Sequence, residues 1–114
     1  MKAVVCRAFG PPESLVLEDV PDPRPAERQV LIDVYAAGLN FPDVLQIAGK
    51  YQFQPPFPFT PGAEVAGVVA EIGPGVAGVA KGDRVMGMTG IGGMAERAVA
   101  AADSVNPIDR KSVV

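Results

Sequence analysis

Glycine and proline interrupt this sequence so often that no apolar segment can continue far within one element. The 114 residues include 13 glycines and 12 prolines, well above their combined share of about 12% in an average protein. Glycine favours turns, and proline lacks the backbone N–H that a central strand or helix interior uses. Many short strands separated by such turns are typical of a barrel or sandwich. The sequence therefore predicts a mainly β fold with one or two short helices.

The apolar runs between these turns predict the strands. Lys2 to Ala8 and Leu15 to Val20 are expected to pair, because only the turn-forming Gly10-Pro11-Pro12 and its neighbours separate them. In the third run Val30, Ile32 and Val34 share one face, which should lie in the core. This third strand is expected over 30–37, and further strands over 64–72 and 84–88. A strand is also expected over 94–102, although its alanines permit a helix, and a last short run covers 104–108.

One short helix is expected after the third strand. Asn40 suits an N-cap, Pro42 lies in the first turn, and Asp43 is placed where a negative charge favours the helix dipole. The helix should end near Gly49. Prolines and aromatic residues alternate over 50–61, which predicts an ordered, extended loop rather than a disordered one.

Charge and hydropathy exclude several classes of partner. The formal net charge is −3 and no basic stripe is present, so nucleic acid is not an expected partner. No apolar run approaches the roughly 18 residues of a membrane span, and the first residues do not form a signal peptide. We expect no membrane partner and a cytoplasmic location.

The absence of histidine removes whole reaction classes. Without imidazole the chain has neither a Ser-His nor a Cys-His pair, and it lacks the commonest metal ligand. A zinc site needs about three or four nitrogen or sulfur ligands from the protein. Cys6 is the only cysteine, and its apolar neighbours suggest a buried small hydrophobe. The sequence predicts no metal site.

Two glycine-rich segments match the G-x-G-x-x-G/A pattern of dinucleotide-binding proteins. That pattern binds a pyrophosphate only where its glycines open a helix. The first match, Gly73 to Gly78, is followed almost at once by the turn Lys81-Gly82-Asp83, which leaves no room for a helix. After the second match, Gly90 to Ala95, 19 residues remain, and a βαβ unit needs about 30. We interpret both segments as turns.

Four segments in order resemble the N-terminal, GroES-like domain of the medium-chain dehydrogenase/reductase superfamily. The resemblance extends from Met1 to about Ile108 and implies a partly open β-barrel. The segments are Ala36 to Asp43, Gly49 to Tyr51, Pro61 to Val69 and Lys81 to Val85.

Within that superfamily, zinc alcohol dehydrogenases carry a cysteine and a histidine at the positions of Asn40 and Ala63. This chain is instead similar to the zinc-free quinone oxidoreductase branch, through its Gly-Leu-Asn-x-x-Asp segment. Glu64 lies near zinc in the metal-bearing relatives, and here it is expected to make a structural hydrogen bond or ion pair.

The resemblance implies hydride transfer from NADPH to a quinone or a related conjugated carbonyl. It places Asn40 and Tyr51 at the catalytic positions, and Asn40 and Asp43 beside the cofactor. Both Asn40 and Tyr51 could donate a hydrogen bond to the oxyanion that develops on the acceptor. Plainer roles remain open: Asn40 as the helix cap, Asp43 as a first-turn hydrogen-bonding residue and Tyr51 as loop packing. Leu45 occupies a position where the family has a tyrosine.

The resemblance covers only the first domain of such enzymes. We expect residues 1–108 to form this domain, residues 109–114 to be a tail that departs from the family pattern, and the Rossmann domain to be absent from this chain. Since that domain holds most of the NADPH, the chain alone should be inactive. Alternatives are an enoyl or enone reductase domain, a co-chaperonin, and a non-catalytic GroES-like interaction module; a homodimer is also compatible with the pattern.

Overall fold

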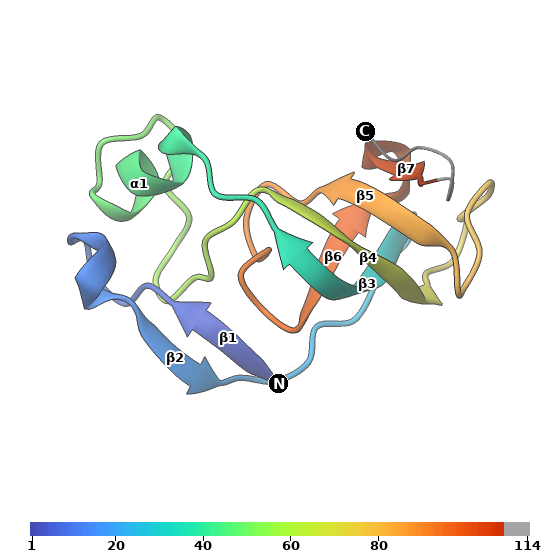
Figure 1. The fold of residues 1–114 in the computed structure, drawn as a ribbon, viewed down its shortest axis with the longest axis horizontal. Helices are drawn as coiled ribbons and strands as arrows, with labels where there is room; N and C mark the ends of the chain where they lie inside the picture. Colours follow the sequence, from blue (N-terminus) through green and yellow to red (C-terminus); the bar gives the residue numbers. More distant parts are fainter. Residues whose placement is uncertain (109–114) are drawn as a thin grey trace.

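A curled, five-stranded antiparallel sheet forms the body of the protein (Figure 1). The computed structural model describes residues 1–108, so the expected tail over 109–114 lies outside the described residues. The strands run in the order β6-β3-β4-β5-β7, with β6 and β7 at the edges. They are β3 (Gln29–Ala37), β4 (Glu64–Ile72), β5 (Arg84–Met88), β6 (Arg97–Ala101) and β7 (Val105–Pro107).

A hairpin and a helix lie at one end of this sheet, on the left of Figure 1. The hairpin pairs β1 (Lys2–Val5) with β2 (Val16–Asp19), as the sequence predicts. The helix α1 (Phe41–Ile47) follows β3. Short 3₁₀ turns cover Pro12–Ser14 and Ala102–Ser104, and neither was expected. The mainly β, partly open barrel with one short helix is confirmed.

Irregularities in the β3–β4 pair account for the curl of the sheet. The register shifts between Leu31 and Ile32 and again between Val34 and Ala36. Such bulges bend a strand and increase its twist. At Gly67 of β4 the carbonyl oxygen of Asp33 occupies the space that a side chain would need. The two long strands can therefore approach closely only because this position is glycine.

All five strands of the sheet contribute to the main core. Val30 and Ile32 are fully buried, and Val34 packs partly buried beside them, which confirms the predicted core face of β3. Leu31 is also buried, although its side chain lies on the opposite face. The remaining buried members of the core are Val65, Val69, Val85, Ala98, Ala100 and Val105.

A smaller core joins the hairpin end of the molecule to α1. Cys6, Ile47 and Phe59 are buried together, with Leu15 and Ile91 packed against them. The backbones of Cys6 and Phe59 also exchange two hydrogen bonds, of 2.8 and 3.1 Å. The loop that follows α1 is thus ordered, as expected, because it is tied to the end of β1.

Four predicted strands are shorter in the structure than in the sequence pattern, two of them by only one residue at each end. The first ends at Val5 rather than Ala8, since Cys6 leaves the hairpin to pair with Phe59. The strand expected over 94–102 begins at Arg97, because residues 94–96 bond to β1 and β3 through single contacts instead.

None of the helices within residues 1–108 has the length and hydropathy that crossing a membrane requires.

Candidate functional site

The start of α1 joins two of the predicted site residues. The backbone N–H of Asn40 donates to the Oδ2 atom of Asp43 at 2.9 Å, and the N–H of Asp43 donates to the Asn40 carbonyl at 3.0 Å. Asp43 is only 7% exposed, whereas the Asn40 side chain lies on the surface. Asp43 therefore acts as a helix-capping residue, and its carboxylate is occupied by the protein's own backbone.

Tyr51 lies beyond the other end of the same helix. The N–H of Lys50 donates to the Leu45 carbonyl at 2.9 Å, and Gly49 adopts a φ of 76°, so the chain reverses direction there. A helix of seven residues is about 10 Å long. The structure thus brings Asn40 and Asp43 together, and it holds Tyr51 at the opposite end of α1, where its ring is 38% exposed.

A mostly apolar groove of about 410 Å³ lies between the end of β3, the start of β4 and the end of β5. Among the described residues, Glu64 is the only charged one that lines it. The sequence does not predict this groove, because its residues come from four separate segments. The lining residues are Ala36 to Gly38, Glu64 to Ala66, Met86 to Met88, Ser104, Asn106 and Ile108.

Glu64 contacts Gly38 at the mouth of this groove. A side chain at Gly38 would collide with the Oε1, Cγ and Cδ atoms of Glu64, and the Gly38 N–H donates to the Glu64 carbonyl at 3.0 Å. Within residues 1–108 the Glu64 carboxylate makes no hydrogen bond or ion pair. The hydrogen bond or ion pair that we expected for Glu64 is therefore not formed with any of the residues 1–108. The Glu64 side chain packs against Gly38 instead.

The donor groups of the described residues do not fit a zinc ion. No three histidine, cysteine, aspartate or glutamate side chains come together anywhere in residues 1–108. Cys6 is buried in the smaller core, where desolvation raises the pKa of its thiol despite a hydrogen bond to the Ala8 carbonyl. A thiol with a raised pKa is a poor ligand, because zinc binds the thiolate.

Neither glycine-rich segment opens a helix. Gly75 and Gly78 adopt φ angles of 77° and 80° within a turn, and Gly90 and Gly92 do the same before β6. Left-handed angles of this kind are natural for glycine in turns. The described part of the chain therefore offers no helix N-terminus that could bind the pyrophosphate of a dinucleotide at these segments, as the sequence predicts.

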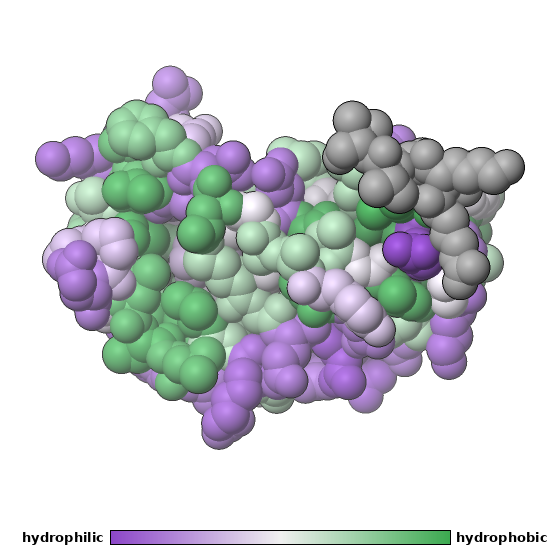
Figure 2. Space-filling model, in the orientation of Figure 1, coloured by the Kyte–Doolittle hydropathy of each residue, from purple (hydrophilic) through white to green (hydrophobic). Residues whose placement is uncertain are grey.

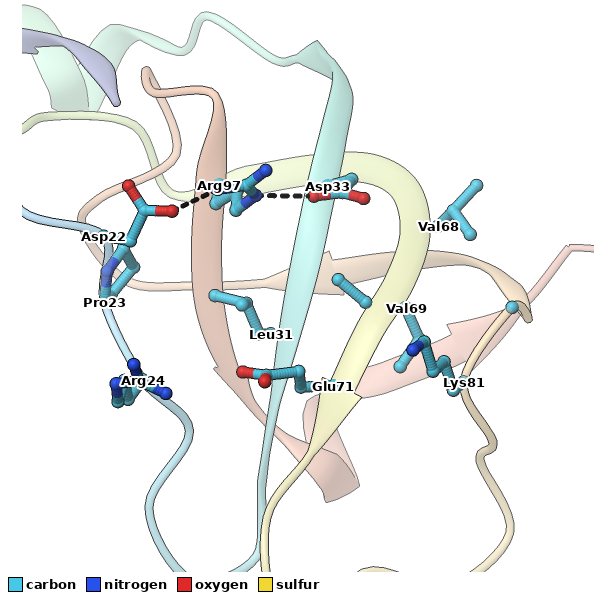
Figure 3. Close-up of a pocket in the computed structure, with 12 residues that line it drawn as sticks. Asp22, Pro23, Arg24, Leu31, Asp33, Val68, Val69, Glu71, Lys81 and Arg97 are labelled. Carbon is cyan, nitrogen blue, oxygen red and sulfur yellow. Dashed lines mark hydrogen bonds and ion pairs between the residues drawn. The ribbon is translucent and has the colours of Figure 1, made fainter.

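Another cavity, of about 550 Å³, lies on the outer face of the sheet (Figure 3). Three of its six charged lining residues pair with one another: the Arg97 guanidinium on β6 bonds Asp33 on β3 at 2.9 Å and also bonds Asp22 in the connector. Leu31 on β3 also lines this cavity, as do Pro23 and Arg24 on the connector (Figure 3). These ion pairs hold the connector against the sheet, and we interpret the cavity as structural.

Comparisons with known proteins agree with this architecture. Residues 26–110 match the family described as the alcohol dehydrogenase GroES-like domain. A quinone oxidoreductase-like protein 2 homolog from Nematostella vectensis is 45% identical over 86% of this chain and 27% of its own length. Quinone oxidoreductase from Rattus norvegicus is 41% identical over 95% of this chain and 33% of its own length.

A solved structure gives the same result in three dimensions. The quinone oxidoreductase of Thermus thermophilus, determined alone and in complex with NADPH, superposes with a TM-score of 0.81 at 35% identity. The match covers 100% of this chain and 34% of that protein. The chain thus spans about a third of these relatives. It belongs to the alcohol dehydrogenase GroES-like domain family, in the quinone oxidoreductase branch of the medium-chain dehydrogenase/reductase superfamily.

Proposed function

We propose that this chain is the acceptor-side domain of an enzyme that transfers hydride from NADPH to quinones or related conjugated carbonyls. The observation that carries this proposal is the match, over the whole chain, to a quinone oxidoreductase solved with NADPH. The proposal needs no metal, which is consistent with the scattered donor groups of residues 1–108.

The described residues fit one end of NADPH better than the other. The exposed Asn40 amide has both donor and acceptor atoms for a nicotinamide or an acceptor carbonyl. The glycine turns, by contrast, lack the helix that a pyrophosphate needs. When bound, NADPH supplies the hydride itself, so the protein's task is to orient two flat molecules and exclude water. The Asn40 amide and the Tyr51 hydroxyl are suited to donating hydrogen bonds to the acceptor oxygen.

Exposed apolar side chains support a second domain over this site. Leu39 is 78% exposed and Phe41 72%, and Met86 and Met88 beside the groove are each 54% exposed. Figure 2 shows apolar surface over the end that carries α1 and the hairpin. Such patches mark surfaces that bind another protein part. We infer that a dinucleotide-binding domain covers this surface in the full-length enzyme, and that the 114-residue chain alone is inactive.

The test compares the full-length enzyme with the isolated chain. NADPH oxidation is followed at saturating 1,4-naphthoquinone, an enone and an enoyl thioester, each assayed separately. We expect quinone turnover by the full-length enzyme and none by the chain. Faster turnover of the enone or the thioester would replace the quinone with that acceptor class. Turnover by the isolated chain, or no NADPH oxidation by the full-length enzyme with any acceptor, would contradict the proposal.

Non-catalytic roles make different predictions. A co-chaperonin would form a ring of several copies, and a free-standing interaction module would bind a partner without any NADPH-dependent reaction. Light scattering of the full-length protein separates these assemblies from a monomer or a homodimer, which the enzyme hypothesis allows.

A further inference from the structure

The two buried polar side chains of the described residues both belong to α1. Asp43 is 7% exposed and Gln46 is 4% exposed, and every other core residue is apolar. Asp43 bonds the Asn40 backbone at the start of the helix. Gln46 lies near the helix's end, so the two polar groups occupy opposite ends of an element of seven residues.

Gln46 connects the helix to the loop that carries Tyr51. Its Nε2 atom donates to the backbone carbonyl of Phe53 at 3.2 Å. The next residue, Ile47, belongs to the smaller core, so Gln46 lies at the edge of an apolar environment. Burial of an amide is unfavourable unless the amide is hydrogen-bonded, and an unbranched apolar side chain of similar size would fill the same space. The amide at this position therefore serves the bond to Phe53.

A second amide holds the same loop from within. The Nε2 atom of Gln54 donates to the Tyr51 carbonyl at 2.8 Å. Before the loop, Gly49 has a φ of 76° and the Phe9 ring packs directly on its α-carbon. The backbone around Tyr51 is thus fixed by its preceding turn, by Gln54 and by Gln46. Among the described residues, only Gln46 links this loop to α1 through a side-chain hydrogen bond.

We propose that Gln46 is a positioning residue that sets the Tyr51 hydroxyl relative to the Asn40 amide. The inference rests on the proposed function, in which these two groups bind the acceptor. Asp43 fixes the Asn40 end of α1 and Gln46 fixes the Tyr51 end. The helix then works as a rigid spacer between the two hydrogen-bond donors.

The structural part is tested by hydrogen exchange on the full-length enzyme. The variant Gln46→Met removes the hydrogen-bond donor and keeps the length of the side chain. If Gln46→Met does not fold, Gln46→Leu is used in its place. We expect the amides of residues 50–54 to exchange about tenfold faster, because a local bond that restrains the loop is lost, with the sheet unchanged. Gln52→Leu is the control, since Gln52 is exposed and makes no side-chain hydrogen bond among the described residues. Unchanged exchange over 50–54 would overturn the proposal.

The functional part is tested by a double-mutant cycle with Tyr51→Phe. If Gln46 acts through the Tyr51 hydroxyl, Gln46→Met lowers kcat/KM about tenfold in the native background and less than about twofold in the Tyr51→Phe background. A merely structural role would give the same loss in both backgrounds and would overturn the proposal. We expect the loss mainly in kcat, because the Tyr51 hydroxyl is proposed to bond the oxyanion that develops during the reaction, with KM for NADPH unchanged.

Failure of the proposed function has a different signature. An unmodified enzyme that oxidises no NADPH with any quinone argues against the proposed function, and it also removes the role of Gln46 in that reaction. If the unmodified enzyme is active and the effects of Gln46→Met and Tyr51→Phe on kcat/KM are additive, only the inference about Gln46 is contradicted.

Discussion

The α-carbon of Gly38 lies directly against the side chain of Glu64, with no room for a methyl group between them. The Gly38 N–H also donates to the Glu64 carbonyl at 3.0 Å. This contact joins the end of β3 to the start of β4, two residues before Asn40. The direction in which the chain leaves the sheet toward α1 is therefore set partly by the absence of a side chain at position 38.

Gly38→Ala should disturb this junction. The added methyl group meets the flexible Glu64 side chain, which has no bond to hold it among the described residues and can move aside, so the cost should be small, about 0.5–1 kcal/mol of unfolding free energy. Urea unfolding of the full-length enzyme measures it. Because the clash is with a side chain, Glu64→Ala in the same molecule should restore most of the loss. Equal instability of Gly38→Ala with and without Glu64→Ala would show that the backbone, not Glu64, requires glycine here.

Gly67→Ala should be more damaging. Its methyl group would meet the backbone carbonyl of Asp33 on the neighbouring strand, which cannot rotate away. We expect a loss of about 3–5 kcal/mol, at the upper end of single substitutions, and low expression. Gly78→Ala is the matched control: it adds the same methyl group in open space and should cost about 1 kcal/mol, from its left-handed φ alone. Similar losses for the two variants would contradict the clash.

Substitutions at Asn40 separate helix capping from catalysis. Serine caps a helix about as well as asparagine, while alanine costs about 1 kcal/mol. We expect Asn40→Ser to keep the melting temperature and Asn40→Ala to lower it. Both variants remove the amide and should reduce kcat/KM for the quinone. Full activity of Asn40→Ser would restrict Asn40 to the cap.

The ion pairs at Arg97 should make stability depend on acid pH. The hydrogen bond from the N-terminal ammonium lowers the pKa of Asp22, and the nearby positive charge of Arg97 lowers it further. Partial desolvation raises this pKa, but by less, so the pKa of Asp22 lies below its ordinary value. A depressed pKa stabilises the folded state above the unfolded value of about 3.9. That contribution disappears as the pH falls through the folded pKa. Unfolding by urea at several pH values should show Arg97→Gln destabilised most near pH 7, with the difference from the native protein shrinking in acid.

High salt provides an independent check of the same pairs. The side chains of Arg97, Asp22 and Asp33 are 42–45% exposed, so salt should screen their ion pairs and reduce the difference between Arg97→Gln and the native protein. A difference that stays constant in both acid and salt would mean that Arg97 contributes by packing alone.

Cys6 should react slowly with a thiol reagent in the native protein. Its side chain is buried, and burial raises the pKa of the thiol, so little reactive thiolate is present at neutral pH. Labelling with Ellman's reagent should accelerate sharply when urea unfolds the smaller core. Fast labelling under native conditions would contradict the burial of Cys6.

Local patterns in the sequence predicted the elements that depend on near neighbours. Asn40 with Pro42 and Asp43 marked the start of α1, and the alternation of Val30, Ile32 and Val34 marked the core face of β3. Leu31 could not be predicted as buried, because it lies on the face of β3 opposite the core, where the alternation of the strand predicts exposure. Gln46 escaped notice for a related reason: an amide in a short helix looks like a surface residue until the loop at Phe53 is folded against it.

The candidate site was predicted only as positions, not as an arrangement. Nothing in the sequence indicates that Glu64 lies against Gly38, since that contact requires β3 and β4 to be paired in the observed register. The pairing of Arg97 with Asp33 likewise depends on β6 lying beside β3. The exposure of Met86 and Met88 follows from the alternation of faces along β5, whose Val85 and Gly87 are buried.

The edge strand β7 restricts how copies of this domain could associate. It is only three residues long and it ends in Pro107, which has no N–H to offer a further strand. On the separate hairpin, Glu18 and Asp19 of β2 are bonded to Arg7 and Lys2, and charged side chains on an outer strand discourage pairing with another chain. Continuous intermolecular sheets, the usual route to fibrils, are therefore disfavoured at both places. A dimer that uses β7 or β2 therefore has to form through side chains.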